Sequence, residues 1–211
     1  MKITKYVHAC LLVEDAGVVV LVDPGVFSYE AKIFDVNALP KLDYIVVTHE
    51  HQDHLHMPFL NELLAKFPNA KIITTPSVVE NLKRAGITNT SSESDGPVEV
   101  FSKKSHADLS PFGAAPENIA VHLNGKLTIG GDRHDIEESK DALALTITAP
   151  WGSMMNAAKM ALNLNPKTVI PIHDWHWNET ARAGAYSMCD GLFKEKGINF
   201  IKPVDGQAFE V

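Results

Sequence analysis

The sequence predicts an α/β fold with two sheets in the middle and helices on the outside. Short apolar segments typical of strands occur near both ends of the chain, and segments with helical periodicity fall between them. No low-complexity tract or long linker divides the chain. Because 211 residues are enough for one large hydrophobic core, we expect a single domain over residues 1–211.

The first half of the chain alternates short strands with amphipathic helices. Strands are predicted where aliphatic and β-branched residues are concentrated, over residues 2–8, 10–14, 18–22, 43–48 and 71–74. A helix over residues 58–67 begins with Pro58, which the first helical turn tolerates, and places its apolar residues on one side. A second helix over residues 77–85 ends at Gly86.

The second half shows the same alternation. Strands are predicted over residues 97–101, 118–123, 126–130, 142–148, 167–172, 198–201 and 207–211. Asn124-Gly125 separates two of them and is a strong signal for a tight hairpin. Helices are expected over residues 153–162 and 179–196. Residues 102–117 contain two prolines and a glycine without a regular period, so we expect an ordered loop across a site.

The composition is that of an ordinary globular protein, with 45% hydrophobic and 21% charged residues. The net charge of −7 argues against a nucleic-acid partner, because phosphates require a basic surface. An anionic small substrate stays compatible with this charge, because two bound divalent ions would reverse the local field.

The two cysteines cannot build a disulfide framework, and they fit a reducing compartment. The N-terminal segment has no cleavage pattern of a signal peptide, and His8 interrupts its apolar run. The longest apolar runs are far too short to span a membrane. We therefore expect a cytoplasmic protein without membrane contact.

The segment from Thr48 to His54 holds the most informative pattern in the chain. It reads H-x-H-x-D-H, with three histidines and one aspartate in six positions. Imidazole and carboxylate groups are ligands for zinc, manganese or iron. His49 and His51 are separated by one residue, so both side chains can point to one metal. Asp53 and His54 lie where the chain turns and can reach a second metal. An apolar strand precedes the pattern, which disfavours a solvated polar loop.

Three more candidate ligands follow apolar strands. Asp132 and His173 come directly after such strands, and His106 lies a few residues beyond another. Strand ends that share one edge of a sheet bring distant residues together on a rigid frame, which a metal site requires. The ordinary alternatives are a turn or helix cap for Asp132 and a structural histidine for His173.

In this order of motifs the chain resembles the metallo-β-lactamase superfamily over nearly its whole length. The markers are an early strand that ends in Asp23, the H-x-H-x-D-H block, a later histidine, Gly131-Asp132 after a hairpin strand, and His173 after a buried strand. His8-Ala9-Cys10 and the segments 124–132 and 169–173 are similar to a compact subgroup that includes the ascorbate-6-phosphate lactonases. The resemblance implies a four-layer αβ/βα sandwich, in which two mixed sheets pack face to face with helices outside.

The resemblance also implies two divalent metal ions, with zinc expected and manganese or iron as alternatives. By the family pattern, metal one is held by His49, His51 and a later histidine, metal two by Asp53, His54 and His173, and both by the bridging Asp132. We assign the later histidine to His106 because it lies in the irregular loop. His122, within a predicted strand, stays open as the alternative.

The catalytic residues that the resemblance implies are Asp53 and Asp132, which would hold the ions beside a hydroxide that attacks the substrate. Four residues are expected to support the ligands or line the substrate pocket: Asp23, His8, His176 and Trp151. Each also has an ordinary interpretation, as a turn residue, a hydrogen-bonded or surface histidine, or a packed tryptophan. We consider His176 a candidate proton donor to the leaving oxygen.

The resemblance therefore implies a metal-dependent hydrolase that cleaves an ester-like bond, a lactone or a phosphodiester, of a small metabolite. The metal ligands alone do not decide which bond is cut. Two alternatives stay open: an iron-dependent redox protein of the same fold, and a metal-binding protein without catalysis. A homo-oligomer is also open, although no exposed apolar stripe in the sequence predicts one.

Overall fold

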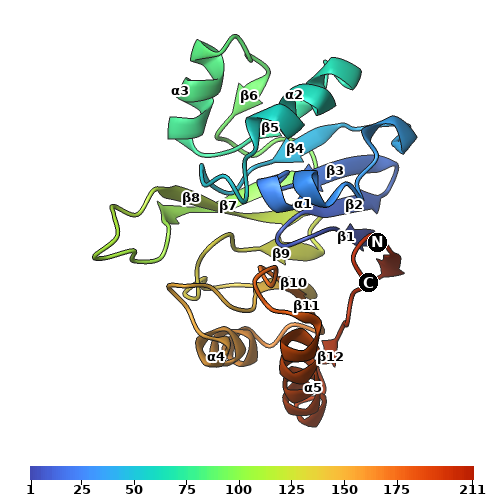
Figure 1. Ribbon diagram of the computed structural model, residues 1–211, viewed down its shortest axis with the longest axis vertical. Coiled ribbons are helices and arrows are strands. Elements are labelled where there is room, and N and C mark those ends of the chain that lie inside the picture. Colours follow the sequence, from blue (N-terminus) through green and yellow to red (C-terminus); the bar gives the residue numbers. More distant parts are fainter.

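Two sheets form the centre of the computed structural model, which describes residues 1–211 (Figure 1). The first sheet has seven strands in the order β13-β1-β2-β3-β4-β5-β6, and the second has six in the order β12-β11-β10-β9-β8-β7. The first consists of β1 (Lys2–Lys5), β2 (Leu11–Asp15), β3 (Val18–Val22), β4 (Tyr44–Val46), β5 (Lys71–Ile73), β6 (Thr90–Ser91) and β13 (Ala208–Glu210). The second consists of β7 (Val98–Ser105), β8 (Glu117–Leu123), β9 (Leu127–Ile129), β10 (Ala142–Thr146), β11 (Thr168–Ile172) and β12 (Asn199–Phe200).

Both sheets are mixed, and they are built alike. In the first, β1, β2 and β3 pair antiparallel, and β3 to β6 continue in parallel. In the second, β7, β8 and β9 pair antiparallel, and β9 to β12 continue in parallel. The predicted Asn-Gly hairpin joins β8 to β9, with both turn residues at positive φ.

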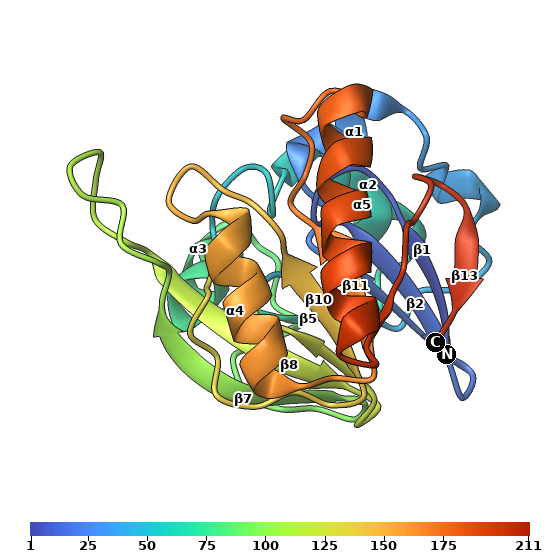
Figure 2. The ribbon, with the colours of Figure 1, turned by 90° about the horizontal axis from the view of Figure 1, so that it is seen from below.

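Helices cover the outer face of each sheet (Figures 1 and 2). The first sheet carries α1 (Val26–Ala31), the short 3-10 helix η1 (Val36–Ala38), α2 (Met57–Lys66) and α3 (Pro76–Arg84), and the second carries α4 (Met154–Leu164) and α5 (Glu179–Glu195). Thr75, Ser153 and Asn178 cap the N-termini of α3, α4 and α5 by accepting a backbone N–H in the first turn. None of these helices combines the length and the apolar character that crossing a bilayer requires.

The alternation of side chains along single strands produces the layers. In β3, Val20 and Val22 belong to the core between the two sheets, whereas Leu21 packs in the core under α2 and α3. In β10, Ala144 faces the central core and Leu143 faces the core under α4 and α5. This period of two places apolar side chains on both faces of each sheet. The predicted four-layer αβ/βα sandwich is confirmed.

The expected loop over residues 102–117 is wrong in extent. Strand β7 continues to Ser105 and pairs with β8, which begins at Glu117, so only residues 106–116 form the connection. The register shifts between Val100 and Ser102, and the strand residues after this bulge are polar. The sequence therefore shows no two-residue alternation of apolar side chains here, because a bulge interrupts the strand and its remaining residues are polar. Helix α1, η1 and the two-residue strand β6 are three further elements that the sequence did not predict.

The last strand closes the first sheet. β13 pairs antiparallel with β1, and the two termini lie side by side, with the Met1 amino group 2.9 Å from the Val211 carbonyl oxygen (Figure 1). The C-terminal segment thereby returns from the second half of the chain to the first. This closure brings Asp205, just before β13, against β1 and α5.

Candidate metal centre

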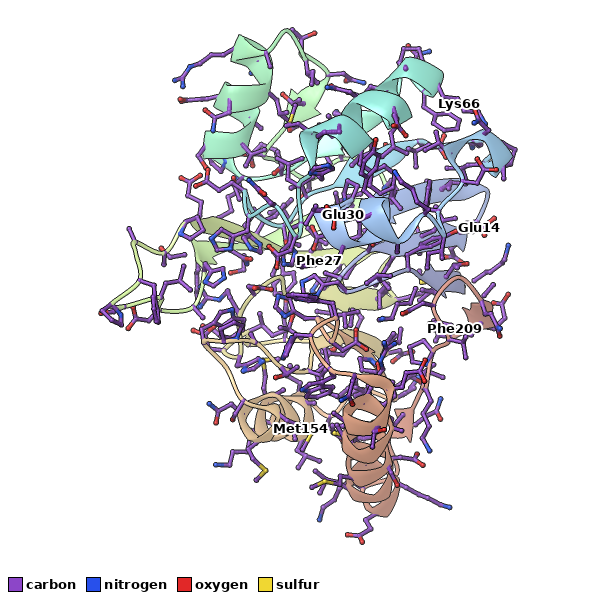
Figure 3. The ribbon with its side chains drawn as sticks, in the orientation of Figure 1. Glu14, Phe27, Glu30, Lys66, Met154 and Phe209 are labelled. Carbon is purple, nitrogen blue, oxygen red and sulfur yellow. The ribbon has the colours of Figure 1, made fainter.

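Five strands end beside one place between the two halves of the molecule. The predicted site residues lie at or just beyond these ends: Asp23 after β3, His49 after β4, His106 after β7, Asp132 after β9 and His173 after β11. Figure 3 draws the side chains and labels Phe27, whose ring centroid lies 5.3 Å from that of His8. The fold thus assembles the site from segments that are distant in the sequence, on the rigid ends of strands.

One group of three imidazoles consists of His49, His51 and His106, whose ligand atoms all lie within 4.8 Å of one another. His49 Nε2 is 3.0 Å from His51 Nδ1. His106 Nδ1 donates to the carbonyl oxygen of Ala107 at 2.7 Å, which directs Nε2 into the site. His49 and His106 are buried, and His51 is half-buried. These are the three residues that the family pattern assigns to metal one, with His106 as the third histidine.

A second group consists of Asp53, His54, His173 and, in addition, His8, again with ligand atoms within 4.8 Å. His8 Nε2 lies 3.0 Å from Asp53 Oδ2. His173 Nδ1 donates to the carbonyl oxygen of Thr148 at 2.8 Å, so its Nε2 faces the carboxylates. The sequence placed His8 only near the pocket, whereas the structure places its ring directly against Asp53.

Asp132 lies between the two groups. Its Oδ1 is 3.3 Å from His54 Nε2, and its Oδ2 is 3.3 Å from His106 Nε2 and 3.1 Å from His173 Nε2. The indole Nε1 of Trp151 donates to the same Oδ2 at 3.2 Å. A carboxylate in this position can contact a cation in either group, which is the bridging position expected from the resemblance.

Asp23 supports the second group from behind. Its Oδ2 is 2.8 Å from His54 Nδ1, and its two oxygens accept hydrogen bonds from the backbone N–H and the hydroxyl of Thr48 at 2.8 and 3.0 Å. The Nδ1 contact leaves His54 Nε2 pointing at Asp132. A carboxylate behind a histidine fixes the orientation of its ring and raises its basicity as a ligand. Asp23 was predicted to support a ligand, whereas no such role was predicted for Thr48, the residue immediately before the motif.

Two glycines allow the backbone to approach the site closely. A Cβ on Gly25 would lie 1.7 Å from the Asp53 carbonyl oxygen, and a Cβ on Gly131, which has a φ of +63°, would lie 2.2 Å from Asn118 Oδ1. Asn118 Oδ1 accepts from the Asp132 backbone N–H at 3.1 Å. Gly25 and Asn118 were also missed, since the Asp-Pro-Gly segment reads as an ordinary turn and a polar residue at a strand start carries no signal.

Three site residues other than glycine adopt left-handed backbone conformations, with φ of 69° at His8, 47° at Asp23 and 66° at His173. The His173 N–H donates to the His8 carbonyl oxygen at 3.1 Å, which joins two of these strained segments. Each such residue costs on the order of 1 kcal/mol. The surrounding strands stabilise these backbone conformations, which direct the three side chains into the site.

Several buried ligand atoms in the site lie close to one another but make no well-aligned hydrogen bond. They are His54 Nε2, His106 Nε2, His173 Nε2 and Asp132 Oδ1. Leaving a buried polar atom unpartnered costs about 1–3 kcal/mol, so a cluster of them on converging side chains is suited to a cation. The donor set of imidazole nitrogens and carboxylate oxygens is that of zinc and related divalent metals.

Burial lowers the pKa of some histidines in the site, and nearby carboxylates raise the pKa of others. Burial lowers the pKa of His8 to about 3 and holds the pKa of His49 well below its usual value. Burial acts in the same direction on His173, but the nearby Asp132 carboxylate outweighs it and raises the pKa of His173 to about 9. Burial would raise the pKa of Asp132, yet the charges of His173 and His54 lower it. The centre therefore presents ionised carboxylates and at least two neutral imidazoles at neutral pH.

Two predicted candidates lie outside the cluster. His122 stacks on Phe101, its ring nitrogens lie 3.0 Å from Thr128 Oγ1 and 3.2 Å from Glu138 Oε1, and it belongs to neither group. His176 is exposed next to Trp175 and Trp177 and is also outside both groups.

The comparisons with known proteins agree with this architecture. The model of the Beta-lactamase superfamily domain matches residues 2–173. A Flavobacterium johnsoniae protein named UPF0173 metal-dependent hydrolase is 30% identical over 148 residues, which are 69% of this chain and 64% of that protein.

Two solved structures show the same fold. Igni18, a metallo hydrolase from Ignicoccus hospitalis, superposes with a TM-score of 0.71 at 18% identity, and the match covers 100% of this chain and 98% of that one. An isothiocyanate hydrolase from Delia radicum gut bacteria gives a TM-score of 0.69 at 16% identity, with 100% and 99% covered. The chain therefore belongs to the β-lactamase superfamily and has the metallo-β-lactamase fold.

Proposed function

We propose that this protein is a metal-dependent hydrolase that holds two divalent ions and cleaves an ester-like bond, a lactone or a phosphodiester, of a small metabolite. The observation that carries the proposal is the convergence of buried, unpartnered ligand atoms around Asp132. The relative from Flavobacterium johnsoniae, named a metal-dependent hydrolase, and the metallo hydrolase Igni18 support the same activity.

The residues present fit two ions. His49, His51 and His106 would hold metal one, Asp53, His54 and His173 would hold metal two, and Asp132 would contact both. Zinc suits this donor set best, and manganese and iron are the alternatives. When bound, such a pair of ions lowers the pKa of a nearby water and polarises the bond to be cleaved.

The side chains of this protein supply the orientation. Asp53 is partly exposed, and its Oδ2 is 3.0 Å from His8 Nε2, so the carboxylate is fixed on one side and can orient an attacking water on the other. Trp151 holds one oxygen of Asp132 through its indole N–H. Asp23 keeps the ring of His54 in one orientation. These contacts position the ligands before substrate binds, which is what fast hydrolysis requires.

The test is elemental analysis of protein purified without added metal, together with activity on a lactone, dihydrocoumarin, and a phosphodiester, bis-(para-nitrophenyl) phosphate. About two zinc or manganese ions per chain with turnover of either probe supports the proposal and identifies the bond. Iron with neither activity would favour the redox alternative, and protein that binds no metal under any loading condition would refute the site.

A further inference from the structure

Two cavities border metal position one, and they differ in character. One, of about 560 Å³, is bounded by His51 and its neighbours Glu50 and Gln52 in the H-x-H-x-D-H loop. The other, of about 330 Å³, is bounded by His106 and Trp151. The rings of His51 and His106 are neighbours, with centroids 4.9 Å apart. A substrate bound at the metal centre therefore has two directions in which to extend.

The larger cavity is lined mainly by apolar side chains, with Gln52 and Asn81 as uncharged polar residues. Leu55, just before α2, and Met57, its first residue, line one side, and Val78 and Leu82 line it from α3. The two helices cover the same sheet and share one apolar core (Figure 1). The only charged residue on the wall is Glu50, so no positive charge is present to bind a phosphate. Its size falls within the range of small-molecule sites.

The smaller cavity is polar, but its positive charge is already paired. Arg133 donates to the Ser105 carbonyl oxygen and to the carboxylate of Asp135. Asp108 and Asp135 add negative charge to the same wall. Lys159 lines an adjoining cavity along α4 that His106 does not border. This side suits a small neutral polar group better than an anion.

The lysines that the sequence places near the loop are engaged elsewhere. Lys103 pairs with Glu93 at 2.5 Å, and Lys104 pairs with Glu137 at 2.6 Å, both at the surface. Apart from the metal ions, the centre therefore has no unpaired cation on these two walls with which to hold a phosphorylated substrate.

Building on the proposed function, we infer that the substrate is a carboxylic ester or lactone with an apolar arm, and that this arm occupies the cavity between the H-x-H-x-D-H loop and α3. The polar part of the substrate lies on the side of His106 and Trp151. The apolar walls of one cavity, the paired charges of the other and the shared metal position together carry this assignment. Each methylene buried in such a cavity strengthens binding by about fourfold.

The test uses the zinc-loaded protein and a series of straight-chain hydroxamic acids, from acetohydroxamic to octanohydroxamic acid. The hydroxamate group binds zinc, and its alkyl chain extends into the space beside the metal. The dependence of the calorimetric Kd on alkyl-chain length therefore measures how well the cavity accepts an apolar group, and no turnover is needed. We expect Kd to fall by about threefold to fourfold per methylene until the cavity is full. A Kd that is independent of chain length would overturn the inference and leave the proposed hydrolase standing.

A matched pair of variants tests where the alkyl chain of the hydroxamate binds. Ala85 lines the apolar cavity from the C-terminal end of α3, and Ala65 is exposed on α2 and does not line it. In Ala85→Trp the Kd should no longer fall as the alkyl chain lengthens, and the Kd of acetohydroxamic acid should be unchanged. In Ala65→Trp the Kd values of the whole series should match those of the wild type. Equal behaviour of the two variants would place the arm elsewhere and reject the assignment. Failure of every hydroxamate to bind would instead reject the accessible metal centre, and with it both proposals.

Discussion

The two sides of the metal centre differ in how the protein encloses them. At metal position one, His51 is half-buried and two cavities adjoin the imidazoles. At metal position two, His8, His54 and His173 are buried, and the Asp53 side chain is 24% exposed. Phe27 and Trp175 stack there with ring centroids 3.8 Å apart, and both rings lie edge-on to His8. Position one therefore adjoins space for a ligand, whereas at position two aromatic rings pack against the imidazoles and Asp53 is the exposed member.

A buried ionic network stands behind the enclosed side. Lys5 is fully buried, and its Nζ lies 3.1 Å from Asp174 Oδ1 and 2.7 Å from Asp205 Oδ1. Tyr186 donates to Asp174 Oδ2, and Arg182 contacts Asp205 at 3.1 Å. Asp174 directly follows His173, so this network holds the turn that carries a candidate ligand. At position one the corresponding support is smaller: buried Arg133 donates to the carbonyl oxygen of Ser105, the residue before His106, and pairs with the exposed carboxylate of Asp135.

The largest expected effect comes from the residue that the two sides share. Asp132→Ala should remove both ions and reduce hydrolysis by more than about a thousandfold, because metal ions supply several kcal/mol of the catalysis. Elemental analysis and kinetics of the purified variant measure both effects. Asp141→Ala, at an exposed surface ion pair, is the control and should behave like the wild type. Full metal content in the Asp132 variant would mean that the two sides are independent.

The buried network behind position two provides the next prediction. Lys5→Met leaves Asp174 and Asp205 without their buried cation, so the free energy of unfolding should fall by about 3–5 kcal/mol. Lys2→Met on the same strand removes only an exposed pair with Glu14 and should cost no more than about 1 kcal/mol. Denaturant unfolding of the metal-free variants makes the measurement. Equal losses in the two variants would show that the enclosed side needs no ionic support.

Asp53 tests whether the two positions can be emptied separately. Asp53→Ala should lose metal two, keep metal one and reduce hydrolysis by at least about a hundredfold. The fold should be retained, because the Asp53 side chain is 24% exposed and no core contact is removed. Titration with cobalt, followed by absorption, counts the remaining sites. A variant that binds two ions and keeps full activity would contradict a mechanism that needs both.

The pH dependence of metal binding gives the smallest expected effect. Burial lowers the pKa of His173, but the Asp132 and Asp53 carboxylates outweigh it and raise this pKa to about 9. The protonated ring therefore stabilises the metal-free protein fully below its unfolded pKa of about 6.5, and this stabilisation is lost as the pH rises toward 9. A metal ion must displace this proton and also that of His54, whose pKa burial would lower but the Asp132 and Asp23 carboxylates hold well above its usual value, so its affinity should rise by at least about tenfold per pH unit in this window.

Competition titrations between about pH 6.5 and 8.5 check this, with calorimetry in buffers of different ionisation heat to count the released protons. The Asp53→Ala protein, which keeps only position one, is the matched comparison and should show a weaker dependence. An affinity that does not change with pH would mean that His173 is neutral in the metal-free protein.

Local sequence accounts for much of the fold and for part of the site. The strands β2, β3 and β11 and helices α2 to α5 were predicted close to their observed bounds, because each buries a regular apolar face that shows as a period in the sequence. The long hairpin of β7 and β8 was cut short, because the outer half of β7 is polar on both faces. The resemblance to the superfamily rested on spaced motifs, and the family match supports it.

By itself, the sequence determined the layered α/β fold and a dense set of side chains able to bind metal, since apolar periodicity and the spacing of the H-x-H-x-D-H block are local properties. Only the tertiary structure decided that His106 rather than His122 joins His49 and His51, and that His8 contacts Asp53. The physical reason is that such contacts depend on which strand ends meet. Strand register, a β-bulge and left-handed backbone conformations at His8 and His173 determine which strand ends come into contact. None of these features leaves a local pattern in the sequence.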